Sequence, residues 1–285
     1  MKAPTTNSKS KPKTVINKSV TVLGAGKLGS ILIQGLLSRG VLSRKQVRAT
    51  VAHPDEVRQV KAKLNITVTM NNAEAVRGAD VILLCVKPQV VRQVLEDIKP
   101  ELKNQVIISV AASVPTTYIE KIIEKRIPVI RTMPNTACMV GCGMIAITKG
   151  AHANERHVEL ARLMFNTIGR TVVVDEKHMD AVTGLSGSGP AYIYTIIESL
   201  AEAGVKVGLP RDVATLLAAQ TTMGAAQVVL ETGDHPALLK DAVTTPAGCT
   251  VDGLMELEEG KLRVTLIKAV VKATHRAKEL LFTES

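Results

Sequence analysis

The stretch Ser19-Val-Thr-Val-Leu-Gly24-Ala-Gly26-Lys-Leu-Gly29 joins a short β-rich run to a glycine-rich turn. Residues 30–39 then carry apolar side chains at helical spacing, so the order is strand, GxGxxG, helix. In this order Gly24 permits a tight turn, Gly26 lets the backbone approach a pyrophosphate, and Gly29 lets the helix pack on the sheet. The stretch therefore predicts a dinucleotide-binding unit, with a glycine-rich turn that holds no ligand as the alternative.

Seven further runs predict the rest of an α/β domain around this unit. We expect strands at residues 47–52, 66–68, 81–86, 105–110, 128–131, 143–148 and 170–174, and a helix over 154–167. Residues 81–86 are apolar throughout, which is typical of a strand buried on both faces of a parallel sheet. The pattern indicates a Rossmann-type dinucleotide-binding domain over residues 19–176.

The ends of these strands carry candidate cofactor residues. His53 follows the second strand, where an NAD-preferring site usually has an acid, and the first acid is Asp55. With Arg58 and Lys61 on the next helix, the pattern favours the extra phosphate of NADP. An exposed loop histidine remains an equal alternative for His53.

Two more strand ends follow the same logic. Asn71 and Asn72 open the next helix, where they contact the cofactor or only cap the helix. Lys87 follows the buried strand and is a candidate cofactor contact, the alternative being a lysine in the turn that leads into a helix. Small residues at 111–113, including Ala112, allow a flat ring to come close.

Composition excludes several classes of function. The net charge is +10, and five lysines without any acid in residues 1–18 supply half of it. We therefore expect a disordered basic tail there. We expect no nucleic-acid partner, because two Phe, three Tyr and no Trp offer little surface for base stacking. The tail has no apolar core of a secretory signal, and no uninterrupted apolar run reaches the ~18 residues of a membrane span.

The four cysteines are Cys85, Cys138, Cys142 and Cys249, and they form no CxxC pair. No metal-ligand spacing surrounds them, so no metal is expected. Free thiols in a reducing compartment are the simplest interpretation, which favours a cytoplasmic location.

From Lys177 onward the pattern is helical to the end, which predicts an all-α second domain over 177–285. Two long helices, over 191–207 and from 210 to 230, are apolar on more than one face. A helix that is apolar all round needs more cover than its own chain provides, so we expect a homodimer core. A compact monomeric bundle is the alternative. The expected core residues are Ile193, Ile196, Ile197, Leu200, Val205, Leu216, Leu217 and Met223.

The stretch Asp241-Ala-Val-Thr-Thr-Pro-Ala-Gly-Cys-Thr250 interrupts these helices. Its proline, glycine and threonines break a helix, and residues 251–258 read as the next one. The free amides of that helix and the threonine hydroxyls suit a small carboxylate. The alternative is a capped turn between two helices.

Over residues 18–282 the chain resembles the pyrroline-5-carboxylate reductase family. The run Thr183-Gly-Leu-Ser-Gly-Ser-Gly-Pro-Ala-Tyr192 is similar to the domain-junction motif of that family. The residues from Pro236 to Glu258 follow the family's spacing most specifically. Gly204-Val-Lys-Val-Gly-Leu-Pro210 and Cys85-Val-Lys-Pro88 add further agreement.

The resemblance implies reduction of 1-pyrroline-5-carboxylate to L-proline by a hydride from NADPH, with NADH also possible. It implies cofactor contacts at Gly24, Ala25, Gly26, Lys27, Leu28, His53, Asn72, Val86, Lys87, Pro88 and Ala112. It implies substrate contacts at Val243, Thr244, Thr245, Ala247, Gly248 and Thr250. The resemblance also implies a homodimer and a decamer that consists of five such dimers.

Within that loop the resemblance assigns separate roles. The Ala247 and Gly248 amides and the Thr245 hydroxyl would hold the carboxylate, and Thr250 would approach the ring nitrogen as the catalytic residue. A protonated cyclic imine needs no strong general acid, so catalysis would rest on orientation. The chain departs from the family at Ala247, where many members have Gly, at Ala242, where some have Asn, and at Thr245, often Ser. Alanine at 247 requires a negative φ or some strain.

Two other functions remain as alternatives. A β-hydroxyacid dehydrogenase has a similar domain plan, but its chemistry needs a lysine base in the helix after the junction. Residues 191–200 contain no lysine, and Ile193 occupies about the expected position. A non-catalytic NADP-binding protein is the other alternative, which the intact substrate loop argues against.

Overall fold

A computed structural model describes residues 15–279 of the chain. The described chain divides into two compact units, one of residues 15–187 with 275–279 and one of residues 188–274. Most of the predicted basic tail, residues 1–14 with four of its lysines, lies outside the described residues. The boundary predicted at residues 176–177 stays a prediction.

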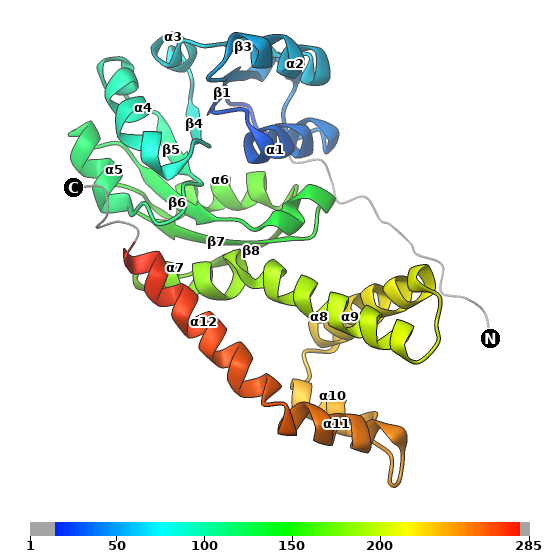
Figure 1. The fold of residues 1–285 in the computed structure, drawn as a ribbon. Helices are drawn as coiled ribbons and strands as arrows, with labels where there is room; N and C mark the ends of the chain where they lie inside the picture. The colour runs from blue at the N-terminus through cyan, green and yellow to red at the C-terminus, as the bar shows by residue number, and fades with distance from the viewer. Residues whose placement is uncertain (1–14, 280–285) are drawn as a thin grey trace. The chain divides into compact units, whose positions relative to one another are not determined.

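One sheet of eight strands forms the centre of the first unit, and it confirms the eight predicted strands (Figure 1). The strand order is β3-β2-β1-β4-β5-β6-β7-β8, and all neighbours are parallel except the antiparallel pair β6 and β7. The strand order reverses at β1 and β4, which is where dinucleotides bind in such sheets. The strands are β1 Val20–Leu23, β2 Val47–Thr50, β3 Thr67–Thr69, β4 Val81–Leu84, β5 Val106–Ser109, β6 Val129–Met133, β7 Gly143–Lys149 and β8 Gly169–Val173.

Helices cover both faces of this sheet (Figure 1). One face packs against α1, α2 and α6, and the other against α3, α4 and α5. The helices of this unit are α1 Lys27–Ser38, α2 Pro54–Leu64, α3 Asn72–Val76, α4 Val91–Ile98, α5 Thr116–Ile123, α6 Glu155–Phe165 and α7 Met179–Val182. Short 3₁₀ turns lie at Arg44–Gln46, Pro88–Val90, Lys99–Glu101, Thr136–Val140 and Glu176–His178.

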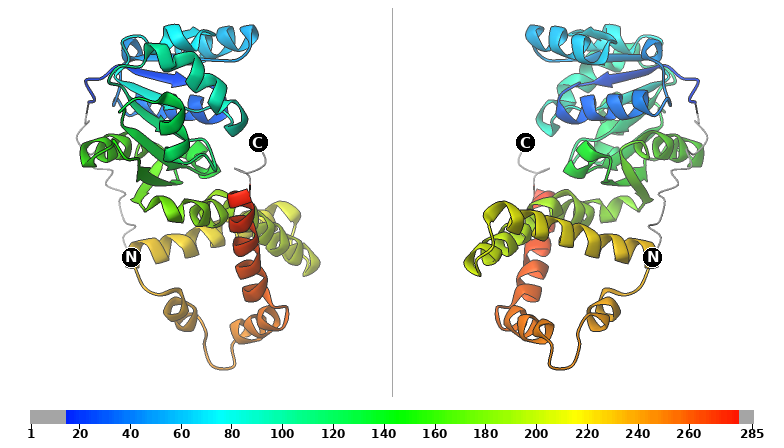
Figure 2. Two further views of the ribbon diagram at one scale, coloured as in Figure 1. Left: turned by 90° about the vertical axis from the view of Figure 1, so that its left-hand side faces the viewer. Right: turned by 90° about the vertical axis from the view of Figure 1, so that its right-hand side faces the viewer.

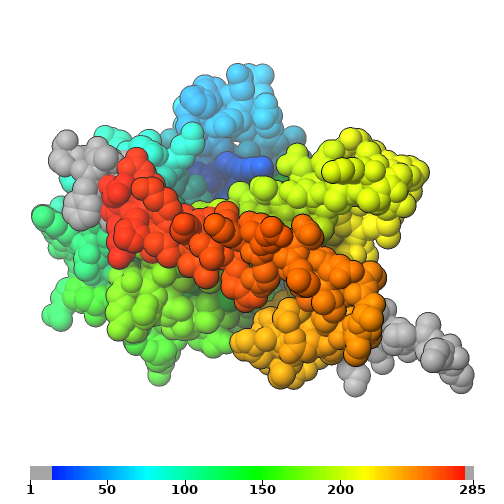
Figure 3. Space-filling view, turned by 60° about the horizontal axis from the view of Figure 1, so that its bottom comes forward, coloured from blue at the N-terminus to red at the C-terminus, as the bar shows by residue number. Residues whose placement is uncertain are grey.

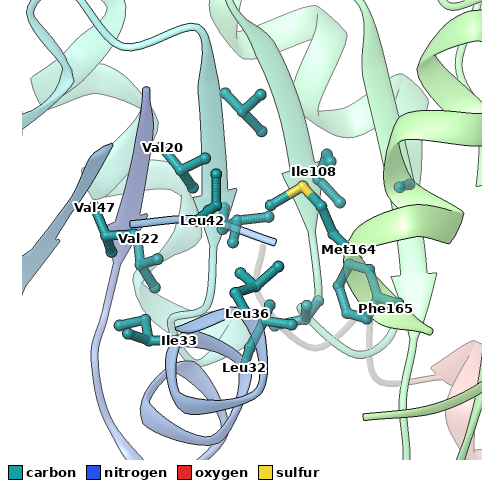
Figure 4. Packing of buried hydrophobic residues seen from close by; sticks show 14 of the residues in the cluster. Val20, Val22, Leu32, Ile33, Leu36, Leu42, Val47, Ile108, Met164 and Phe165 are labelled. Atoms are coloured by element: carbon teal, nitrogen blue, oxygen red, sulfur yellow. The ribbon is translucent and has the colours of Figure 1, made fainter. Parts of the chain in front are cut away.

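The hydrophobic core follows the alternation of side chains along the central strands. In β4, Val81 and Leu83 belong to the core on the α1 side, whereas Ile82 and Leu84 belong to the core on the α4 side. All four are fully buried, as expected of a strand covered on both faces. On the α1 side, Leu32 and Leu36 pack near Met164 and Phe165 of α6 (Figure 4). This packing holds α1 in place against the sheet.

A buried charge network ties the end of the first unit to its sheet. The side chain of Arg131, in β6, is only 3% exposed and donates to the Glu176 carboxylate at 2.7 Å. Glu176 also accepts hydrogen bonds from the backbone N–H and the hydroxyl of Thr116 at 3.3 and 3.2 Å. Asp180 lies 3.9 Å from the same guanidinium group. The network therefore joins β6, α5 and the start of α7, and it fixes the segment that leads to the domain junction.

The junction motif itself has an unusual backbone. The helix α7 changes at Thr183 into a π-helix over Thr183–Gly187. A Cβ atom on Gly187 would lie 2.6 Å from Cε of Met133, so the small residue allows the junction to approach the end of β6. Such π-helical turns often accompany functional sites.

The second unit is entirely helical, which confirms the predicted class (Figure 2). Its helices are α8 Gly189–Lys206, α9 Arg211–Thr232, α10 Pro236–Ala242, α11 Cys249–Glu259 and the first part of α12 Leu262–Glu279. α8 and α9 pack against each other through Gly204, where a Cβ atom would lie 2.9 Å from Cβ of Ala214. In the space-filling view α11 and α12 (orange to red) lie open along one face (Figure 3).

The helix α9 is an exception to the expectation that no segment is long and apolar enough to span a membrane. α9 has 22 residues and an 18-residue window of mean hydropathy 1.4, so by length and composition it could cross a membrane. Threonines, glutamines and a glycine interrupt its apolar residues, which is why no continuous apolar run marks it in the sequence. Only 11% of that window is buried within the described chain, so α9 presents apolar side chains that its own unit does not cover.

Candidate active site

Two glycines shape the turn after β1. Gly24 has φ +90°, and a Cβ atom there would lie 2.8 Å from Cγ1 of Val86 and 3.0 Å from the carbonyl oxygen of Cys85. A Cβ atom on Gly29 would lie 2.3 Å from the carbonyl oxygen of Gly24. The roles predicted for these two residues, a tight turn and close packing of α1, are therefore confirmed.

The N-terminus of α1 has the features of an anion site. Its N-cap is Gly26, without any side-chain cap, and no acid lies in the first turn. A Cβ atom on Gly26 would meet no atom within 4 Å, so the space beside it is open. The amides of Gly26, Lys27, Leu28 and Gly29 bond to no other residue in the range 15–279. Free amides at the positive end of a helix fit the pyrophosphate of a dinucleotide.

The remaining candidate cofactor residues follow neighbouring strands at the same edge of the sheet. Ala25 is held there, because its amide donates to the carbonyl of Thr50 in β2 at 2.7 Å. His53 is exposed and is the N-cap of α2, and its own amide donates to the Glu56 carboxylate at 3.2 Å. This position agrees with both interpretations of His53, as a phosphate contact and as a loop histidine.

The two asparagines have different roles. Asn71 is the N-cap of α3 and accepts from the amide of Glu74 at 3.0 Å, so for Asn71 the capping interpretation is right. Asn72 is the first residue of the helix, and its Nδ2 lies 3.4 Å from the Asp97 carboxylate. Asn72 therefore stays a predicted cofactor contact.

The segments after β4 and β5 complete this edge. Lys87 is exposed and precedes the 3₁₀ turn Pro88–Val90, between the half-buried Val86 and Pro88. Ala112 is half-buried after β5. Burial raises the pKa of the nearby Cys85 thiol to about 12, so Cys85 stays protonated and is no nucleophile at neutral pH. None of the four cysteines forms a disulfide in the described chain.

The sequence patterns did not lead us to predict a site in the segment that follows β6. Five of the residues from 134 to 139, after β6, line a cavity of about 220 Å³ together with residues of α1 and Gly187. The signal was present, because Met133-Pro-Asn-Thr136 follows a predicted strand at the edge where the other candidates lie. The cavity is lined by Lys27, Leu28, Ile31, Pro134, Asn135, Thr136, Cys138, Met139 and Gly187.

The six predicted substrate residues all lie in the second unit, five of them between α10 and α11 and Thr250 in the first turn of α11. Val243 is 65% exposed. The hydroxyl of Thr244 donates to the carbonyl of Lys240 at 2.7 Å, so it closes the end of α10. Thr245 is exposed, and its hydroxyl oxygen would lie 2.4 Å from a Cβ atom on Gly248. Only glycine at 248 therefore lets the Thr245 side chain lie against the start of α11.

Ala247 has φ +56°, in the left-handed region. Of the two possibilities that the sequence left open, the strained one is therefore the observed one. Gly248 caps α11 without a side-chain cap, and its amide donates to the carbonyl of Thr245 at 3.1 Å. The amides of Ala247, Cys249 and Thr250 bond to no other residue of the described chain. The half-buried Thr250 lies in the first turn of this helix.

Comparison with known proteins identifies the family. A family model described as pyrroline-5-carboxylate reductase dimerisation matches residues 176–280, and one described as NADP oxidoreductase, coenzyme F420-dependent, matches residues 19–113. Pyrroline-5-carboxylate reductase of Methanosarcina acetivorans is 42% identical over 93% of this chain and 98% of its own length. The enzyme of Arabidopsis thaliana is 41% identical over 92% and 95%.

The chain belongs to the pyrroline-5-carboxylate reductase family.

Solved structures of this family agree with the fold. The pyrroline-5-carboxylate reductase of Coxiella burnetii has a TM-score of 0.87 at 34% identity, covering 93% of this chain and 99% of its own. The pyrroline carboxylate reductase of Plasmodium falciparum, solved with NADP bound, has a TM-score of 0.84 at 30% identity, covering 95% and 100%. The resemblance of the sequence to the reductase family is therefore confirmed, as are the Rossmann-type domain and the helical dimerisation domain.

The two turn glycines of this reductase predict separable effects. Gly24→Ala should lower stability by about 1–3 kcal/mol, because the new methyl group meets Val86 and the Cys85 carbonyl at a positive φ. Gly26→Ala should leave stability nearly unchanged, since it enters open space, but should weaken NADP binding. Thermal unfolding and calorimetric titration with NADP measure the two effects. Equal loss of stability in both variants would contradict this division.

Proposed function

We propose that the chain reduces 1-pyrroline-5-carboxylate to L-proline with NADPH, the last step of proline biosynthesis. The observation that carries the proposal is the similarity to reductases of this name along more than nine-tenths of both chains. The cofactor cradle supports it, because open space beside Gly26 and free amides at α1 fit a dinucleotide. Bound NADPH supplies the hydride.

The loop between α10 and α11 holds the substrate in this proposal. The free amide of Ala247 and the hydroxyl of Thr245 bind the carboxylate at the positive end of α11. The Gly248 amide joins them by leaving its bond to the Thr245 carbonyl. Thr250, in the first turn of the helix, holds the ring nitrogen. The described loop contains no strong acid in contact with these groups, and a protonated imine needs none.

Purified protein should oxidise NADPH only when 1-pyrroline-5-carboxylate is supplied, which fluorescence at the reduced nicotinamide band follows directly. Initial rates with NADPH and NADH then give the preference, and we expect NADPH to be favoured because Arg58 and Lys61 follow His53. A β-hydroxyacid dehydrogenase would instead reduce NADP with a hydroxyacid. A non-catalytic protein would bind NADPH without turnover. Either result would overturn the proposal.

Thr250→Ala should lower kcat at least about tenfold, since a hydrogen bond to a charged group is worth ~1.5–3 kcal/mol. NADPH affinity and thermal stability should stay near those of the wild type, and Thr250→Ser should restore most of the rate. Thr215→Ala is a matched control, because that hydroxyl bonds only to the Arg211 carbonyl of its own helix. An unimpaired kcat in Thr250→Ala would remove this role.

The chain carries the family's dimerisation domain, and we propose a homodimer. Leu216, Met223 and Leu230 are spaced by seven residues on α9, so they share one face of that helix. They are 68%, 55% and 60% exposed within the described chain. An apolar stripe of this kind is stabilised by a second copy, and it accounts for the membrane-like composition of α9 better than a lipid bilayer does. Five such dimers joined in a decamer complete the proposed assembly.

Leu216→Glu should shift the protein toward monomers, because a carboxylate would be buried in the interface. Light scattering over a range of concentrations measures this, and activity should fall with the dimer. Leu216→Met keeps the volume and the apolar character, so it should stay dimeric. A wild-type mass of one chain at all concentrations would contradict the proposed dimer.

We also propose a cytoplasmic location, supported by exposed free thiols at Cys142 and Cys249, which suit a reducing compartment. The proposed partners are small molecules and a second copy of the chain, without nucleic acid or membrane. The scarcity of aromatic residues supports the absence of a nucleic-acid partner.

A further inference from the structure

The cavity after β6 has one polar side chain that is already oriented. Asn135 is the N-cap of the 3₁₀ turn Thr136–Val140, yet its side chain does not cap that turn. Instead, Oδ1 accepts a hydrogen bond from the backbone N–H of Met144 in β7 at 3.3 Å. Because an N–H group can donate only to the oxygen, this bond fixes which end of the amide is which.

The other end of the Asn135 amide remains available. Nδ2 makes no hydrogen bond with any residue between 15 and 279. Asn135 is half-buried and lines the cavity, whose other walls include Leu28, Ile31 and Met139. A mainly apolar cavity in which one donor is held in a fixed orientation is typical of a site for a flat ring with a polar substituent.

The arrangement of the cofactor cradle indicates which ring this is. The pyrophosphate fits the free amides of α1, and the predicted phosphate contact His53 follows β2, on one side of β1. A dinucleotide lies across the switch point, so its other half extends over the ends of β4, β5 and β6. Asn135 follows β6, and Leu28 of the same cavity lies in the first turn of α1. The cavity is therefore on the nicotinamide side.

We propose that Asn135 positions the nicotinamide ring by donating a hydrogen bond from Nδ2 to the carboxamide oxygen, while Met144 holds Oδ1. This role rests on the proposed use of NADPH. The bond sets the rotation of the ring in its plane, and with it the position of the carbon that carries the hydride. Leu28 and Ile31 give the ring an apolar wall and exclude water from one of its faces.

Asn135→Asp tests the donor alone. The carboxylate keeps an acceptor for the Met144 amide and loses the N–H group, whereas Asn135→Ala loses both. Asn104→Asp is the matched control, since it makes the same change at an exposed residue before β5, at the opposite edge of the sheet. Thermal unfolding of each variant checks that the fold persists.

The readout is binding, measured by calorimetry for two ligands. NADPH has an uncharged ring, and 2′-phospho-ADP-ribose lacks the nicotinamide. Asn135→Asp and Asn135→Ala should both weaken NADPH binding about 3- to 10-fold, the scale of one hydrogen bond. Both should bind 2′-phospho-ADP-ribose within about twofold of the wild type, as should Asn104→Asp for both ligands. Turnover with 1-pyrroline-5-carboxylate should fall further than NADPH affinity, because ring orientation is disturbed.

Three results would overturn the assignment. First, Asn135→Asp could bind NADPH with wild-type affinity while only Asn135→Ala loses affinity for NADPH. The Asn135 side chain would then be a structural support for Met144 and not a donor to the ring. If the variants bound NADPH and 2′-phospho-ADP-ribose with equally lowered affinity, the effect would lie at the phosphates and not at the nicotinamide. Absence of NADPH binding in the wild type would remove the proposed function as well, which separates that failure from failure of the Asn135 role alone.

Discussion

The contact between Gly29 and the carbonyl oxygen of Gly24 is the constraint on which the cofactor end of the structure depends. A Cβ atom on Gly29 would lie 2.3 Å from that oxygen, so the first turn of α1 is pressed onto the backbone that ends β1. Core packing of Leu32 and Leu36 holds the helix there. As a result, the free amides from Gly26 onward are fixed at the edge where the neighbouring strands end.

The second proposed anion site also lies at a helix that begins after a glycine and has free backbone amides. Gly26 caps α1 and Gly248 caps α11, and neither helix has a side-chain cap. A Ser, Thr, Asp or Asn side chain is the preferred cap of a helix N-terminus, as Asn71 is for α3. Leaving these N-termini without a side-chain cap costs stability in the absence of a ligand, but it keeps backbone donors free. A pyrophosphate and a carboxylate are the groups that would satisfy them.

Local patterns predicted the fold well, because most strands are short runs rich in β-branched residues and bounded by turn residues. They did not predict that β7 runs antiparallel to β6, which follows from the short connection over residues 134–142 that carries no crossover helix. Nor did they reveal the Arg131 network or the cavity at Asn135. Both join segments distant in sequence: Arg131 meets Glu176, and Leu28 meets residues after β6. The substrate loop was predicted by resemblance, and its backbone conformation needed the structure.

Ala247 shows how that loop combines strain with readiness to bind. A non-glycine residue in the left-handed region costs about 1–2 kcal/mol, and many family members avoid this with glycine. At φ +56° the Ala247 amide bonds to no residue described in the structure, next to the positive end of α11. Alanine has fewer unfolded conformations than glycine, which offsets part of the strain. The same substitution restricts the loop before substrate arrives, so less conformational entropy is lost on binding. Strain at this position is therefore consistent with a preorganised carboxylate site.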